Sequence, residues 1–188
     1  EVAYATVTKT VRAQSHAEVA RYLEAKHSVP VRNSIAVAIA RHYRAAADLV
    51  KDLPTLEGVD ADEVTIGALR WLDEAGWRAL SAGEPREAER WFGGGLDLAV
   101  DAASMARCLF GRAKARCELR DLAGTRADLE RLDPLVHGDP VMAAKALMVR
   151  GDINQKAGEL DRAAEQLREA ADQLDQLNEP ADHALALR

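Results

Sequence analysis

Two histidines and two cysteines are the side chains of this 188-residue sequence best suited to chemistry. His16 and His42 lie on the apolar sides of two predicted neighbouring helices, and Cys108 and Cys117 are nine residues apart within a third. Two histidines without a further ligand at metal-binding spacing do not make a zinc site, so we expect hydrogen-bonded core histidines. Nine residues along a helix place the two thiols on roughly opposite faces, too far apart for a disulfide. Free thiols favour a reducing, cytoplasmic location.

Loops that bind phosphate or calcium are not recognisable in the sequence. A nucleotide-binding Gly-x4-Gly-Lys-Ser/Thr loop is missing, and the glycine run over 93–95 follows two aromatic residues in a helical pattern, which favours close helix packing. The acidic run over 57–63 lacks the length and the closing glutamate of a calcium loop, so we expect a solvated linker. His137 is expected in a solvated loop. No catalytic constellation follows from spacing, and we expect no enzyme, no cofactor and no metal.

Composition narrows both the fold and the class of partner. With 25 basic and 31 acidic residues the net charge is −6, which argues against nucleic acid as a partner. No run of about 18 uncharged apolar residues is present, so no membrane span is expected. Aromatic residues make up only 4% and alanine is abundant, a balance that favours packed helices over sheets. We therefore expect an all-α protein.

Apolar residues recur at helical spacing almost throughout, and the interruptions predict where helices end. The first two helices are expected over 5–26 and 31–50 with a turn at 28–30, and they form an N-terminal hairpin over 1–53. The acidic segment after Pro54 is the best candidate for a boundary. Farther on, Asp139 before Pro140 predicts a capped helix start. Gly83 and Gly158 suit the left-handed residue that ends a helix.

Three later segments resemble one another, and this internal repetition is the most informative feature of the sequence. Gly76, Ala113 and Gly151 are equivalent positions, separated by 37 and 38 residues. Small residues there would let helices approach closely, and larger residues would fill the space between successive helix pairs. The small and large residues that follow the two outer positions at equal distances are Ala88 and Phe92, then Ala163 and Leu167.

This pattern resembles the tetratricopeptide repeat, a helix–turn–helix unit of about 34 residues. The resemblance implies three helix pairs within 61–177, at about 69–102, 106–139 and 144–177, stacked as a right-handed superhelix, which is an α-α solenoid. The third unit matches well, the first has Pro85 where an aromatic or leucine is usual, and the middle one is degenerate, with Thr125 in place of alanine. Residues 178–188 are expected to open a further helix that the chain cuts short.

A second resemblance covers about residues 1–50 and includes the opening Glu1-Val2-Ala3-Tyr4, then Arg12, His16 and Leu23, then the run over 39–46. These residues are similar to the segment after the ATPase module in large actinobacterial-type signalling proteins, which are nucleotide cyclases or helix-turn-helix transcriptional regulators with an attached NTPase module. The resemblance implies an ATPase module that precedes this chain, and repeats directly after the hairpin. The extra segment over 51–63 departs from the pattern.

In tetratricopeptide repeats the first helix of each pair lines a concave groove with its second, fifth, ninth and twelfth positions. These positions would form a face that alternates large apolar anchors with cations, a composition typical of interface centres. The alternative is that Trp77 and Phe110 belong to the core. The residues of this face are Arg70, Asp73, Trp77 and Leu80, then Arg107, Phe110, Lys114 and Cys117, then Lys145, Met148, Asp152 and Gln155.

Together these features predict a non-enzymatic interaction and coupling module of a larger cytoplasmic signalling protein. Its partner would be an acidic, partly apolar protein or peptide segment, supplied by another domain of the same parent or by a separate protein. The alternative is a self-association module that forms a homodimer through its exposed ends or its groove. A part of an enzyme active region is less favoured, because the sequence supplies no pocket of catalytic residues.

Overall fold

The computed structural model describes residues 8–26, 35–51 and 58–177, and the regular structure there is helical. The expected all-α class is therefore confirmed. The residues of the predictions at 1–4, 28–30, Pro54 and 178–188 lie outside the described residues. The helices are α2 (Lys9–Lys26), α4 (Ala36–Val50), α5 (Ala61–Ser81), α6 (Pro85–Leu96), α7 (Ala102–Glu118), α8 (Leu122–Leu132), α9 (Pro140–Ala157) and α10 (Leu160–Gln176), with a 3-10 turn, η1, at Asp133–Leu135.

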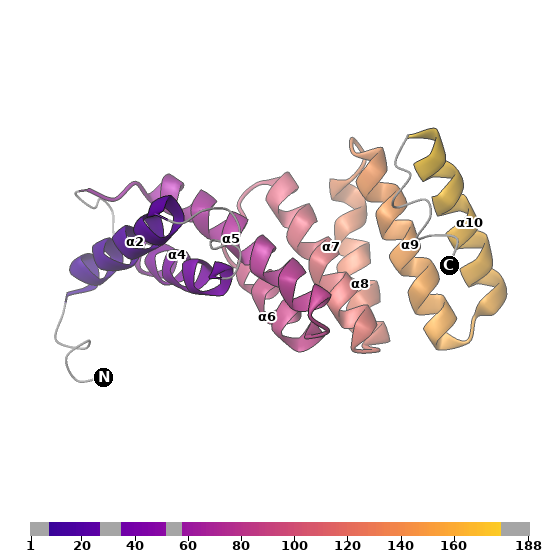
Figure 1. The fold of residues 1–188 in the computed structure, drawn as a ribbon. Helices are drawn as coiled ribbons and strands as arrows, with labels where there is room; N and C mark the ends of the chain where they lie inside the picture. Colours follow the sequence, from indigo (N-terminus) through magenta and orange to yellow (C-terminus); the bar gives the residue numbers. More distant parts are fainter. Residues whose placement is uncertain (1–7, 27–34, 52–57, 178–188) are drawn as a thin grey trace.

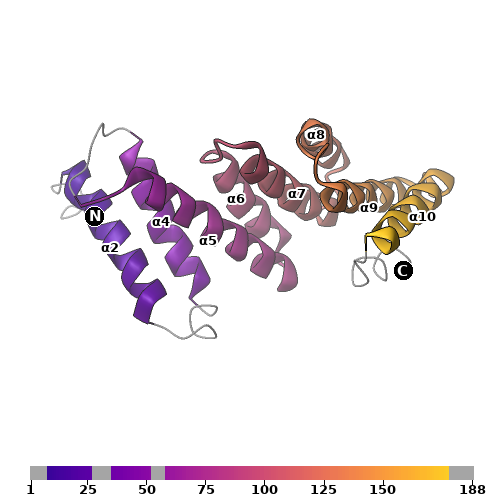
Figure 2. The same cartoon turned by 90° about the horizontal axis from the view of Figure 1, so that it is seen from above.

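Helices that follow one another in the chain pack in adjacent pairs, so the described helices form an elongated row from α2 to α10 (Figure 1). The pairs α5–α6, α7–α8 and α9–α10 lie where the sequence repeats, although α5 begins at Ala61, ahead of the first predicted unit. The contact between α8 and α9 is much narrower than that between α6 and α7. From above, α8 is seen almost end-on and lies off the line of α7 and α9 (Figure 2).

Aspartates and glycines mark several helix ends. Four of the described helices begin at an aspartate whose side chain accepts a hydrogen bond from a backbone N–H of the first turn, which would otherwise have no partner. Gly83 and Gly158 follow α5 and α9 with left-handed φ angles of 73° and 86°. The predicted helix start at Asp139 and both predicted glycine stops are therefore confirmed. The capping residues are Asp60, Asp101, Asp121 and Asp139.

The ring of Phe92 fills the space between α5, α6 and α7. It is fully buried and lies against Gly76 of α5 and Gly111 of α7. A β-carbon added at Gly76 would lie 2.6 Å from the ring, and one added at Gly111 would lie 2.3 Å from it. Neither distance is tolerable for two carbon atoms, so close packing requires glycine at both positions.

The same pairing of a small with a large residue recurs in the other two pairs. Leu167 of α10 packs on Gly151 of α9, where an added β-carbon would lie 2.6 Å from the leucine. In α7–α8, Ala113 and Leu129 are buried in one apolar cluster. In each unit the large residue comes sixteen positions after the small one, as Phe92 comes after Gly76. The repeat spacing therefore corresponds to contacts between paired helices.

The N-terminal pair α2–α4 packs on α5 and shares its core. Tyr43 of α4 lies against Gly67 of α5, where an added β-carbon would come within 2.6 Å of the ring. Arg44 reaches α6, where it donates to the Gly94 carbonyl and pairs with Asp97 at 3.1 Å. One apolar cluster extends from α2 through α4 and α5 to α7. The hairpin and the helices α5 and α7 therefore share one apolar core.

A buried carboxylate connects α6, α7 and α8. Asp128 is 1% exposed and accepts two hydrogen bonds from Arg112, at 2.9 and 2.6 Å. Arg116 donates to the same carboxylate at 2.9 Å and to Glu89 of α6 at 2.8 Å. The two guanidinium groups compensate the charge that burial would otherwise make costly.

We predict opposite effects for two Gly-to-Ala substitutions in neighbouring helices. Gly76→Ala should lower the free energy of unfolding by about 1–3 kcal/mol, because the new methyl group overlaps the Phe92 ring. Gly93→Ala should raise it by up to about 1 kcal/mol, because alanine favours helix and the new carbon would have no described neighbour within 4 Å outside its own stretch of helix backbone. Urea unfolding followed by circular dichroism measures both. Equal effects would contradict the packing around Phe92.

Loss of the buried carboxylate should be among the most damaging single changes. Asp128→Ala should lower the free energy of unfolding by about 3–5 kcal/mol, because it leaves the half-buried guanidinium groups of Arg112 and Arg116 without their shared acceptor. Asp172→Ala, at an exposed position of α10, is the matched control and should change it by less than about 0.5 kcal/mol. A similar loss in the two variants would contradict a specific role for Asp128.

Candidate interaction surface

Helices α5, α7 and α9 carry the residues that the repeat register selects. Within each helix these residues are spaced by three or four positions, which places them along one side. The structure brings some of them together in two places, a cleft between α5 and the start of α7, and a polar cluster between α7 and α9. The predicted residues that line the α5–α7 cleft are exposed or half-buried.

The α5–α7 cleft has a volume of about 540 Å³. Arg70, Asp73 and Arg107 all line it, so the structure brings three predicted residues from two helices together. Two apolar side chains in the lining are unusually accessible, since Ile66 is 66% and Val100 is 86% exposed. Exposed apolar side chains beside arginines are typical of surfaces that bind other proteins.

Asp73 is the acidic group of this cleft that interacts with the core. It accepts a hydrogen bond of 3.1 Å from the Trp77 indole Nε1. Burial raises the pKa of the Asp73 carboxyl, and this effect outweighs the opposing effects of Arg107 and of the Trp77 hydrogen bond. The ionised carboxylate is therefore less well solvated here than in water, and a cationic or donor group of a ligand would stabilise it.

Trp77 is half-buried, and its ring is part of the core as well as of the surface. It lies edge-on to Phe92, with ring centroids 5.3 Å apart, and it is tilted against Phe110 at 5.9 Å. Leu80, one turn farther along α5, is also half-buried and packs in the cluster around Phe92. Trp77 thus remains accessible in part, while its position is set by the two phenylalanines.

Phe110 and Met148 are not exposed anchors, in contrast to the expectation from the register. Each is only 7% exposed. Phe110 is buried with residues of α8 and α9, and Met148 is buried with alanines of α10 and with Leu174. Cys117, at the twelfth position, is 2% exposed. Because neighbouring helices cover these positions, their apolar side chains gain more from burial than a solvent-facing position would allow.

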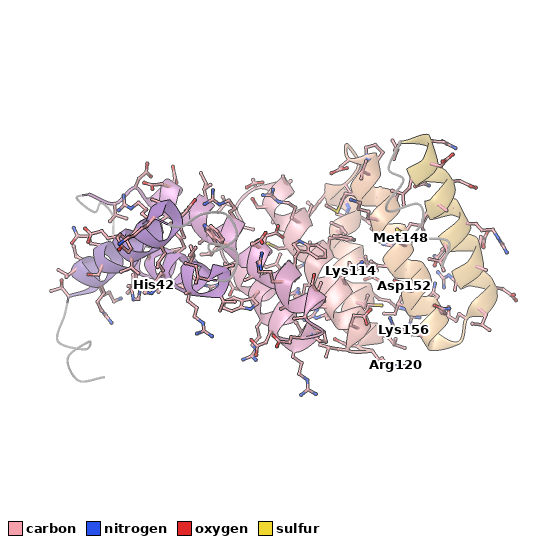
Figure 3. All side chains as sticks on the ribbon, viewed as in Figure 1. His42, Lys114, Arg120, Met148, Asp152 and Lys156 are labelled. Carbon is pink, nitrogen blue, oxygen red and sulfur yellow. The ribbon has the colours of Figure 1, made fainter. Side chains whose placement is uncertain are left out.

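The polar cluster between α7 and α9 contains a half-buried acid with lysines around it. Burial raises the pKa of Asp152, and nearby Lys156 and Lys114 only partly oppose this effect. The Lys156 Nζ lies 3.5 Å from the Cys117 Sγ and 3.4 Å from a carboxylate oxygen of Glu118. Figure 3 shows Lys114, Asp152 and Lys156 near one another over α7 and α9. Lys156 thus joins the ends of these two helices.

The predicted cations differ in whether other residues of the protein already engage them. Arg70 forms an ion pair with Glu24 of α2. Arg107 and Lys114 form no hydrogen bond or ion pair with any other described residue, although Arg107 influences Asp73 electrostatically. They are seven positions apart on α7, so both lie on one side of it. On α9, Lys145 is half-buried and Gln155 is exposed. Arg107 and Lys114 therefore keep their donors for a ligand.

Three residues of this surface were not predicted from the sequence. Ile66 precedes Arg70 by four positions, so extending the α5 stripe by one turn would have found it. Lys156 follows Asp152 by four positions in the same way. Val100 precedes α7 in an irregular segment, and no periodicity marks it as part of a cleft.

The histidines and cysteines that the sequence marks as chemically suitable lie in surroundings typical of structural residues. The Nδ1 atoms of His16 and His42 lie 2.9 Å apart, so both histidines are hydrogen-bonded, as expected, although they are half-buried. Both cysteines are buried and free; burial raises the pKa of Cys108 to about 11 and also raises the pKa of Cys117. His137 is exposed in a turn, as predicted. Thiols with raised pKa values react slowly, because the thiolate is the nucleophile.

Comparison with known proteins does not assign the chain to a family. No protein-family model matches the sequence, and no curated protein matches it significantly. Within the described ranges, no group of three or more histidine, cysteine or acidic side chains could hold a metal ion. None of the helices in those ranges combines the length and apolar character needed to cross a membrane.

Removal of the half-buried charges should stabilise the protein at neutral pH. Asp73→Asn and Asp152→Asn should each raise the thermal unfolding midpoint at about pH 7, because burial disfavours the ionised carboxylate and an amide oxygen can still accept a hydrogen bond. The raised pKa values mean that the folded protein takes up protons first as the pH falls, so the advantage should shrink towards about pH 4. Asp172→Asn is the exposed control. Lower midpoints would show that the nearby cations outweigh burial.

Proposed function

We propose that this chain is a non-enzymatic interaction module that binds a protein or peptide segment on the side formed by α5, α7 and α9. The α5–α7 cleft carries this proposal, because it combines exposed Ile66 and Val100 with the guanidinium group of Arg107, which forms no hydrogen bond or ion pair with another described residue. Binding sites need apolar area for affinity and polar groups for orientation, and the cleft offers both within about 540 Å³.

The partner segment would be acidic and partly apolar. An apolar side chain would occupy the space between Ile66 and Val100, and carboxylates would approach Arg107 and Lys114. These two cations are seven residues apart on α7, a rise of about 10 Å, so the segment would follow the α7 axis for several residues. Trp77 would contribute the exposed part of its ring. Phe110 and Met148 are not included, since both are buried.

The tetratricopeptide-like superhelix is part of the same proposal. Its support is the contact of a small residue with a large residue sixteen positions later, at Gly76 and at Gly151, and the burial of the equivalent Ala113 and Leu129 in one cluster. Side-by-side packing of successive helices is compatible with such an array. The row of helices departs from a regular array at α8–α9. A regular array would repeat the broad α6–α7 contact there, but the α8–α9 contact is narrow.

The larger protein would be a cytoplasmic signalling protein of the kind that the N-terminal residues resemble, a nucleotide cyclase or a helix-turn-helix regulator with an NTPase module. The described part of that resemblance includes Arg12, His16 and Leu23 on α2 and the run over 39–46 on α4. In such a protein a row of packed helices would transmit force between the NTPase module and a bound partner. The acidic partner segment that binds the α5–α7 cleft could then belong to another domain of the same protein.

Self-association is the second candidate function, and one observation favours it. The outer side of α2 exposes Val11 by 46%, Val19 by 38% and Tyr22 by 54%. These residues recur at helical spacing on the terminal helix of the described row, so a second copy could cover them. Light scattering during gel filtration distinguishes a dimer from a monomer that binds a segment.

Selection from a random peptide library tests whether the α5–α7 cleft binds an acidic, partly apolar segment. We expect the protein to enrich peptides that combine acidic and apolar residues, and the double variant Arg107→Glu and Lys114→Glu should bind them at least about tenfold more weakly, equivalent to about 1.4 kcal/mol. Binding to the parent should weaken with salt but persist, because the apolar contacts remain.

Arg131→Glu is the matched control, since it reverses an exposed arginine on α8, away from this surface. It should bind the selected peptides as the parent does. The proposal fails if no such peptides are enriched, or if the double variant binds as well as the control.

A further inference from the structure

His16 of α2 and His42 of α4 form the one described contact between two imidazole rings. Their Nδ1 atoms are 2.9 Å apart, their ring centroids are 5.1 Å apart, and both side chains are half-buried. In such a contact one nitrogen donates a proton and the other accepts it. The pair can therefore hold one additional proton, but a second would set two N–H groups against each other.

The side chains that α2 buries fully are small. The side chains that α2 buries are the alanines Ala13, Ala17 and Ala20. Burial of a methyl group contributes only about 1 kcal/mol or less, so α2 depends strongly on its polar contacts with α4 and α5. Besides the histidine pair, Glu24 makes polar contacts with α4 and α5 at the C-terminal end of the helix.

The Glu24 contact does not respond in the pH range where histidines titrate. Glu24 accepts hydrogen bonds from Tyr43 at 2.9 Å and from Trp71 at 3.2 Å, and it pairs with Arg70. Burial alone would raise the pKa of the Glu24 carboxyl, but these three donors lower it overall. Glu24 therefore stays ionised in mildly acidic solution, whereas the histidine contact can change there.

The charged groups around the pair oppose a further proton. Burial, His42 and Arg12, in that order, lower the pKa of His16. Arg41, next to His42 in sequence, lies over the Trp91 ring at 6.0 Å. Arg44, farther along α4, is engaged by acceptors: Asp48, Asp97 and the Gly94 carbonyl. The charged groups of α5 that face α2 lie near the C-terminal end of α2. There Glu63 is 3.8 Å from Arg21, and Arg70 pairs with Glu24.

We infer that the His16–His42 contact is an acid-sensitive latch, which holds α2 against α4 at neutral pH and releases it when a second proton would set two N–H groups against each other. The direction of this pH dependence follows from the number of protons that the closed and the released states bind. Free imidazoles have a pKa of about 6.5, and the latched pair binds fewer protons than two free histidines below that pH. The contact therefore stabilises α2 above about pH 6.5, and its contribution is lost as the pH falls.

Release of α2 would have local consequences that other residues report. Trp71 is 7% exposed and donates to Glu24 of α2, so its environment changes when the helix leaves. The alanine-rich side of α4 would also become accessible. Because α2 ends the described row of helices, the latch would make the attachment of this end sensitive to pH, while the α7–α8 contacts around Asp128 are unaffected.

Hydrogen exchange of the full 188-residue chain tests the latch. Exchange of peptides from 9–26, corrected for the intrinsic pH effect, should show an opening equilibrium up to about tenfold larger at about pH 5.5 than at about pH 7.5, since release takes up roughly one proton. Peptides from α7 and α8 should show no such change. His16→Asn should abolish the increase, because an amide can donate or accept but does not titrate in this range.

His137→Asn is the matched control, because it removes an exposed histidine outside the latch and should leave the increase intact. If His16→Asn loosens α2 already at neutral pH, His42→Asn and NMR titration of the two imidazoles in the parent decide the matter. A suppressed second protonation supports the latch. Two imidazoles that titrate independently near pH 6.5, or an equal pH response in the parent and in both variants, would overturn it.

Discussion

The spacing of α5 and α7 is set by one phenyl ring. Phe92 lies between Gly76 and Gly111, and neither position has room for a β-carbon. Because close-packed interiors have few voids, a change in this ring or in either glycine would shift one helix relative to the other. Asp73 precedes Gly76, and Arg107 precedes Gly111, each by about one turn. The α5–α7 cleft thus takes its width from a contact on the inner sides of the same helices.

Polar contacts determine how the remaining helices are fixed, because much of the apolar core consists of alanine. Short side chains allow close approach but allow sliding as well, and they offer little specificity of position. Asp128 joins α7 and α8 with the help of Arg112, and Glu24 joins α2 to α4 and α5. At α8–α9 the described contact is narrower, and it includes the hydrogen bond of 3.3 Å that Arg150 of α9 donates to the Leu129 carbonyl of α8. The contact between α8 and α9 is therefore where the angle between adjacent helix pairs could change most easily.

The candidate interaction surface differs in character from the one that the repeat pattern implies. Its large apolar residues are mostly used by the core, and accessible apolar area comes from Ile66 and Val100 instead. Its available cations are Arg107 and Lys114, since Arg70 is already paired within the chain. A ligand would therefore obtain apolar contact mainly at α5 and the start of α7, and electrostatic contact along α7, which suits an extended segment better than a flat protein face.

The sequence by itself determined the all-α class, the capped start at Asp139, the glycine stops and the repeat of small and large residues, because helix propensity, capping and periodicity are local properties. It also identified Arg70, Asp73 and Arg107 as residues of one face. Only the tertiary structure decided that Phe110 and Met148 are covered and Val100 is exposed. Those outcomes depend on how closely neighbouring helices approach, as do the pairing of Arg70 with Glu24 and the contact of His16 with His42. No spacing within one helix encodes the distance to the next.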